Sequence, residues 1–167
     1  MKIIKGIWRK YILYNSFLLL LLKIFNKIYY YNYKIIFIIW PPAYHLSNQI
    51  ADDISKNYEI NNIYDCKIKK SEFEHFLSDV YNIDNKNYKK KVHLKYERLI
   101  ENNCIIKVIE VNFKMPTIEV QDILNNKRCI DAHIIKDYIR VKYKKNTNNY
   151  IFDIIIHSTE TQKQSSR

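Results

Sequence analysis

The chain has 167 residues, with 28 lysines and arginines against 17 aspartates and glutamates, and its formal net charge is +11. Its one glycine excludes the glycine-rich phosphate loops of the dinucleotide-binding and P-loop types. The three cysteines form no Cys-x-x-Cys pair, which argues against a zinc ribbon or a thioredoxin-like pair and favours a reduced, cytoplasmic-facing domain.

The basic charge has two explanations. Isoleucine, lysine, asparagine and tyrosine are all abundant, as an adenine- and thymine-rich coding sequence would produce. Alternatively, the charge serves a phosphate-bearing partner or an anionic membrane surface. The length favours one domain.

Residues 1–10 are basic and residues 11–25 are mostly apolar, as in the first two regions of a signal peptide, but no small-residue cleavage site follows. The uninterrupted apolar core is shorter than the ~20 residues that span a bilayer. We therefore expect residues 1–32 to form an N-terminal helix. Three roles stay open: an uncleaved membrane anchor or interfacial helix, a helix packed on the domain or on a partner, or a region outside the normal fold.

The pattern of residues 34–53 predicts a strand that ends at a proline, followed by a loop and a helix. Residues 35–40 are β-branched or aromatic without polar alternation, which suits a strand buried on both faces, as in a parallel sheet. Pro41 ends this strand because it cannot donate to a ladder. Ser47 is the expected N-cap of a helix with Ile50 and Ile54 on its apolar face.

The remaining elements follow in order. We expect a strand over 60–68, a helix from a capping box at Ser71 to residue 82, a turn at 84–86, a helix over 88–101 and a strand over 104–113. Residues 118–126 are irregular or a short helix. A helix over 129–144 turns Ile130, Ile134, Tyr138 and Val141 inward, and residues 150–157 form the last strand.

Alternation of helices and strands predicts an α/β fold. We expect one small domain over residues 33–159, with a mainly parallel or mixed sheet of about four strands covered by helices, and a disordered tail over 160–167.

His157 ends the last apolar run, and Ser158, Thr159 and Glu160 follow it directly. If this strand is parallel to residues 35–40, His157 shares one rim of the sheet with residues 41–47, where ligands collect in open α/β sheets. His157 and Glu160 are then candidate acid/base residues. The alternative is a histidine that merely ends a strand. The candidate ligand-binding residues are Pro41, Pro42, His45, Ser47, Lys136, Arg140, Ser158 and Thr159.

Lys136, Arg140 and Lys144 recur every fourth residue along one helix face. Such a row can contact phosphates, and it can equally be a solvated face. His75, His93 and His133 lie on predicted helices without companion ligands, so we expect no metal site and no cofactor.

Two resemblances bear on function. His45-Leu46-Ser47 and His157-Ser158-Thr159 resemble the paired His-x-Ser/Thr tripeptides of two-histidine phosphoesterases, which implies an acid and a base acting on a cyclic phosphate at His45, Ser47, His157 and Thr159. Residues 38–47, 136–143 and 153–157 are similar to segments of uncharacterised bacterial α/β proteins associated with surface-polysaccharide and glycosyltransferase-like enzymes. That likeness covers about residues 34–164, brings no activity, and implies a transferase-related protein or a fragment of a longer one.

The leading hypothesis is an α/β domain that binds a phosphorylated ligand, a nucleotide or sugar-phosphate, at the rim of residues 41–47 and 157–160. The alternatives are a non-catalytic accessory domain tethered to a membrane through residues 11–25, a phosphoesterase, and an RNA-binding protein. We expect a cytoplasmic protein, either free or membrane-associated through the N-terminal helix.

Overall fold

The structure, a computed structural model, describes residues 33–82, 88–100, 103–120, 127–147, 150 and 153–159. The predicted N-terminal helix, the turn at 84–86 and the tail at 160–167 lie outside these residues. Within the described part of the chain, no helix has both the length and the hydropathy needed to cross a bilayer.

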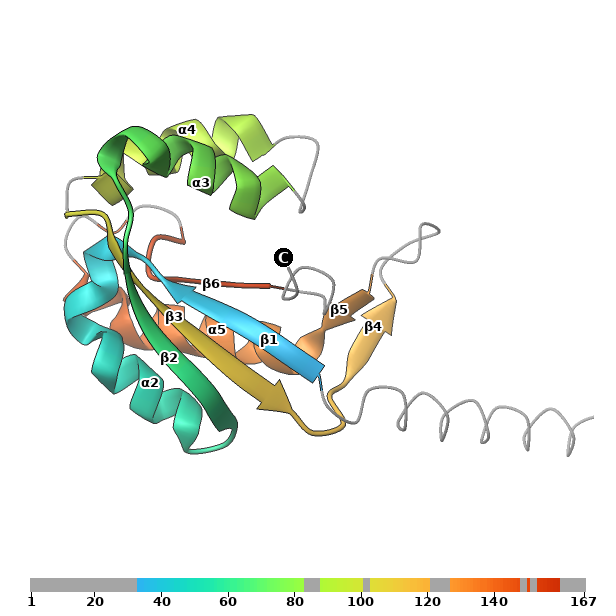
Figure 1. The fold of residues 1–167 in the computed structure, drawn as a ribbon. Helices are drawn as coiled ribbons and strands as arrows, with labels where there is room; N and C mark the ends of the chain where they lie inside the picture. Colours follow the sequence, from blue (N-terminus) through green and yellow to red (C-terminus); the bar gives the residue numbers. More distant parts are fainter. Residues whose placement is uncertain are drawn as a thin grey trace, which may run out of the picture.

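The main sheet has four strands in the order β2-β3-β1-β6 (Figure 1). Their bounds are Tyr33–Ile39 for β1, Glu59–Lys67 for β2, Ile105–Phe113 for β3 and Ile156–Ser158 for β6. All three pairings, β1 with β3, β1 with β6 and β2 with β3, are antiparallel.

The helices complete the architecture. α2 (Ser47–Ser55) joins β1 to β2, α3 (Lys70–Asn82) and α4 (Tyr88–Ile100) join β2 to β3, and α5 (Ile130–Tyr143) precedes β6. When α3, α4 and the two short strands between β3 and α5 are left aside, the order is β-α-β-β-α-β, the arrangement of ferredoxin-like, or split β-α-β, folds.

The α/β class and the four strands are confirmed, but the predicted parallel or mixed sheet is wrong. β1 and β2 run in the same direction with β3 inserted between them, and β3 and β6 run in the same direction with β1 between them. The strands joined by α2, β1 and β2, are therefore parallel without being neighbours, and each hydrogen-bonded pair in the sheet is antiparallel.

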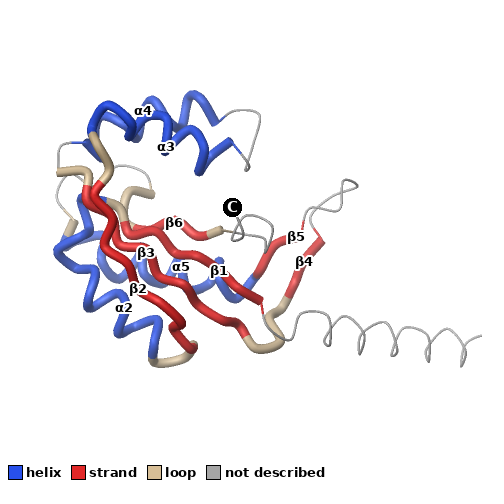
Figure 2. The backbone as a smooth tube through the Cα atoms, viewed as in Figure 1, coloured by secondary structure: helices blue, strands red, loops and turns tan. Residues whose placement is uncertain are grey.

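β1 is largely buried because helices pack against both of its faces. Its side chains alternate between two cores, with Ile35 and Phe37 in the core under α2 and α5, and Ile38 in the core under α3 and α4. Figure 2 shows the α3–α4 pair on its own side of the strands. The apolar run is thus explained by a central antiparallel strand between two helical layers.

Local departures from the expected elements are small but informative. Residues Pro41–Leu46 form a 3-10 helix, η1, rather than a loop, and Leu46 is the N-cap of α2 in place of Ser47. Residues 118–120, predicted to be irregular or part of a short helix, form the strand β4 (Ile118–Val120). β4 pairs with β5 (Lys127–Cys129) in a second, two-stranded sheet. A second 3-10 helix, η2 (Lys144–Asn146), follows α5.

The predicted inward face of α5 is wrong. Ile134, Tyr138 and Val141 are exposed, whereas Ile135 and Ile139 are buried against the sheet. The apolar side chains of α5 fall on two faces with helical spacing, so periodicity alone could not choose between them.

Asp53 links α2 to α5 in the first core. Its buried carboxylate accepts hydrogen bonds from Lys142 Nζ at 2.5 Å and Tyr143 Oη at 2.8 Å, and Lys56 Nζ lies 2.7 Å from its other oxygen. Burial raises the pKa of Asp53, but these donors outweigh it and lower the pKa to about 2.

We predict that Asp53→Asn lowers the free energy of unfolding by about 2 kcal/mol at neutral pH, because it replaces a charged acceptor of three donors with a neutral amide. The carboxylate of Asp53 is more acidic in the folded than in the unfolded chain, so its contribution is complete above about pH 4 and disappears as the pH falls toward about 2. Urea denaturation across that range measures it. Asp52→Asn, an exposed neighbour on α2, is the control, and an equal loss in both variants would contradict the link.

Candidate functional site

His157 is the predicted site residue that the structure places in the most unusual surroundings. Its backbone is opposite Ile38 in the β1–β6 pair, and its ring lies 6.2 Å from the ring of Trp40 and 4.9 Å from that of Tyr81. The histidine side chain, on the edge strand β6, is therefore enclosed by residues at the end of β1 and at the end of α3.

The charges of three basic residues act on this buried ring. Lys136 and Arg140 come from α5 and Lys95 comes from α4, and both lysines are buried. Burial lowers the pKa of His157 well below its ordinary value, and the charges of Lys136, Lys95 and Arg140 lower it further. We call these four residues the cationic cluster.

The two helices reach the cluster from opposite faces of the sheet. α4 packs in the core that contains Trp40, and α5 packs in the other core. β6 is the edge strand, and Arg140 Nη2 donates to the carbonyl oxygen of Ile156 on that strand at 3.1 Å. The cluster thus forms where both helical layers meet at one edge of the sheet.

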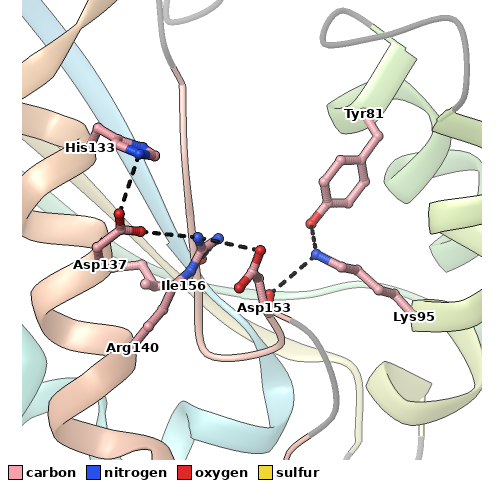
Figure 3. Close-up of polar contacts among 7 residues, drawn as sticks. All are labelled: Tyr81, Lys95, His133, Asp137, Arg140, Asp153 and Ile156. Carbon is pink, nitrogen blue, oxygen red and sulfur yellow. Dashed lines mark hydrogen bonds and ion pairs between the residues drawn. The ribbon is translucent and has the colours of Figure 1, made fainter.

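Hydrogen bonds and ion pairs hold Lys95 and Arg140 in place, as Figure 3 shows. Lys95 Nζ donates to Tyr81 Oη at 2.9 Å and to the backbone oxygen of Asp153 at 3.3 Å. Arg140 Nη1 lies 3.4 Å from Asp153 Oδ2 and 3.5 Å from Asp137 Oδ1. Asp153 is therefore bound to α4 through its backbone oxygen and to α5 through its carboxylate.

Two buried N–H donors beside His157 have no acceptor among the described residues: Arg140 Nε and Trp40 Nε1. A buried donor without an acceptor is costly, and such groups call for a water, an ion or a ligand. Their position in and against the cationic cluster makes an anion with several oxygens a suitable acceptor.

The predicted rim is only partly assembled. The parallel arrangement on which it depended is wrong, and Ser158 is opposite Phe37, one residue further from η1 than His157. Thr159 lies beside Ile36, where its Oγ1 accepts a hydrogen bond from the backbone N–H at 2.9 Å. His157 does contact Trp40, the residue directly before η1.

The other predicted ligand residues are distributed as follows. Pro41, Pro42 and Ser47 are buried and His45 is exposed, while Glu160 lies outside the described residues. Lys136 is buried and the side chain of Arg140 is 15% exposed, so neither belongs to a solvated face, and both charges act on His157. The role of each residue in binding stays a prediction.

Sequence reasoning missed Trp40, Tyr81, Lys95 and Asp153 as site residues. The one signal for them is Lys95, which stands three residues after Val92 and four before Leu99, within the buried stripe of α4. A lysine at such a position needs a partner in the core. Among the described residues, no group of three or more histidine, cysteine, aspartate or glutamate side chains is arranged to hold a metal ion.

Comparison with protein-family models and with curated proteins finds no match. Solved structures that resemble the chain include three nucleoside diphosphate kinases. The Aquifex aeolicus enzyme is 11% identical, with a TM-score of 0.46 over 81% of this chain and 90% of that one. The Borrelia burgdorferi enzyme, a transition-state mimic with vanadate and ADP, is 12% identical, with a TM-score of 0.45 over 81% and 83%. The Pyrobaculum aerophilum enzyme is 13% identical, with a TM-score of 0.43 over 81% and 92%. Similarity at this level establishes neither family nor activity.

We predict that His157 stays neutral in the folded protein at pH values where an exposed histidine is protonated. Because its pKa is lowered in the folded chain, the unfolded chain gains a proton first as the pH falls below about 6.5. The free energy of unfolding should then decrease by at most about 1.4 kcal/mol per pH unit from this residue.

Chemical denaturation of wild type and His157→Gln measures this contribution. It is carried out at several pH values from about 7.5 to about 5.5, a range of ~2 pH units around the ordinary pKa of histidine. The variant should lose that part of the pH dependence. Identical slopes in the two proteins would show that His157 titrates normally.

Proposed function

We propose that this chain binds a phosphorylated small molecule, such as a nucleotide or a sugar-phosphate, at the cationic cluster. The observation that carries the proposal is the convergence of Lys95, Lys136 and Arg140 from two helices on one buried histidine. The overall charge of +11 would favour an anionic ligand, but it is the placement of these three charges that selects the site.

Electrostatics supports an anionic occupant. Taking a cation out of water is unfavourable unless opposite charge or hydrogen bonds compensate for it, and like charges placed together add to the cost. Two carboxylates that contact Arg140, those of Asp137 and Asp153, are both about half exposed. A phosphate dianion would bring a larger negative charge to all three cations at once.

Hydrogen-bond geometry supports a ligand with several acceptors. Arg140 and Trp40 each retain a buried N–H without an acceptor in the described part of the chain, and the lysine ammonium groups carry three donors each. Phosphate oxygens accept several charge-assisted hydrogen bonds together. A single carboxylate would satisfy fewer of these donors.

His157 gives the site a group that can act on the ligand as well as hold it. A neutral imidazole has one N–H donor and one nitrogen lone pair, so it can donate to a phosphate oxygen or accept a proton from a hydroxyl group. The neighbouring cations favour this neutral form by lowering its pKa. We therefore assign His157 to proton transfer or hydrogen bonding at the bound phosphate.

We predict that Arg140→Gln weakens binding of the phosphorylated ligand by about tenfold or more, because it removes the guanidinium donors from the cluster. Isothermal titration calorimetry with pyrophosphate, ADP and a sugar-phosphate measures the affinity of each. Lys145→Gln removes the same charge from an exposed residue just after α5 and is the matched control.

The control should bind within about twofold of wild type, since an exposed charge contributes little to a buried site. Circular dichroism confirms that each variant is folded. Equal weakening in both variants would indicate attraction to the general surface charge, and absence of binding by the folded wild type to any of the probes would refute the proposal.

A further inference from the structure

Asp153 occupies a particular place in the cationic cluster. It lies two residues before the buried Ile155 and four before His157, in the segment that leads into β6. Its backbone oxygen accepts a hydrogen bond from Lys95 at 3.3 Å, and its carboxylate lies 3.4 Å from Arg140 Nη1. Figure 3 shows the residue between Arg140 on one side and Lys95 on the other.

The two halves of this residue differ in how firmly they are held. The backbone is held between the buried Ile154, which follows it directly, and the buried Lys95, which donates to its oxygen. The carboxylate is 50% exposed, and the Arg140 side chain that it faces is 15% exposed. Ion pairs with an exposed partner contribute little net stability, so this carboxylate can turn toward water without moving the backbone.

We propose that Asp153 is an internal, displaceable anion of the cationic cluster, and that it determines which ligands the cluster accepts. Its carboxylate occupies the position on Arg140 that a ligand phosphate would take. Only a ligand that brings more negative charge and more acceptor oxygens than one carboxylate displaces it. The residue therefore selects phosphate dianions over carboxylates and other monoanions, and this inference depends on the proposed function.

Asp137 contacts the same nitrogen of Arg140 but does not have the same role. It stands on α5 three residues before the arginine, and Oδ1 lies 3.5 Å from Nη1. Its other oxygen, Oδ2, lies 3.3 Å from His133 Nε2 one turn earlier. Asp137 therefore orients the guanidinium from within its own helix, as a positioning residue, whereas Asp153 approaches from the strand side.

The test compares Asp153→Asn with Asp137→Asn, which raise the net charge by the same amount beside the same atom. Binding of pyrophosphate and ADP is measured by calorimetry for wild type and both variants. We expect Asp153→Asn to bind about two- to fivefold more tightly than wild type, because the competing carboxylate is gone. Asp137→Asn should show no gain or a loss.

Acetate provides a second readout that general electrostatics would not give. In Asp153→Asn a free carboxylate can enter the vacated position, so acetate should compete with pyrophosphate in this variant. In wild type the position is filled, and acetate should have little effect at the same concentration.

The outcomes separate this inference from the proposed function. Equal gains in both variants, or no gain and no acetate competition in Asp153→Asn, would overturn the role of Asp153 while leaving phosphate binding intact. No binding of pyrophosphate or ADP by folded wild type and by folded Asp153→Asn would refute the phosphate site itself.

Discussion

The antiparallel pairing of β1 with β3 on one side and β6 on the other is the constraint on which the other features depend. It places β1 inside the sheet, so that every side chain from Ile35 to Trp40 except the half-buried Ile36 is buried on one face or the other. The same pairing brings the backbone N–H of Trp40 to the carbonyl oxygen of Ile155 at 3.0 Å. That hydrogen bond fixes the position of β6 along β1, and so places the ring of His157 against Trp40 at the end of β1.

The α3–α4 pair completes the candidate site. It packs on the sheet face that carries Ile38 and Trp40, and it supplies Tyr81 and Lys95 at the edge where α5 supplies Lys136 and Arg140. Burial then has opposite effects on the members of the cluster. The imidazole is shifted toward its neutral form, whereas a guanidinium keeps its charge, as arginine does throughout proteins. A neutral base among retained charges is an arrangement suited to anions.

The sequence allowed the elements to be predicted better than their pairing. Residues 35–40 had to be covered on both faces, but a central antiparallel strand between helical layers meets that requirement as well as a parallel one. α5 shows the same ambiguity, because Ile134 and Tyr138 repeat with the same spacing as Ile135 and Ile139. Lys136 was a candidate phosphate ligand because of its helical spacing, and its burial could not be predicted because it depends on partners from distant segments.

His157 was recognisable because it ends an apolar run, whereas Lys95 and Asp153 gained their importance only when the tertiary fold brought them together. The sequence pattern around Tyr81 and Trp40 is that of ordinary core residues, and both side chains are indeed buried. Local patterns report burial and periodicity, but a polar site built from both faces of a sheet has no local pattern.

The central claim is that an anion is bound inside the cationic cluster rather than on the basic surface. The most direct measurement is an NMR titration with pyrophosphate that follows the Arg140 Nε–H and Trp40 Nε1–H resonances, the two donors that lack acceptors in the described part of the chain. The account predicts that both resonances shift and saturate together, with the dissociation constant found by calorimetry. Saturable shifts confined to exposed lysines, with both buried N–H resonances unchanged, would contradict it.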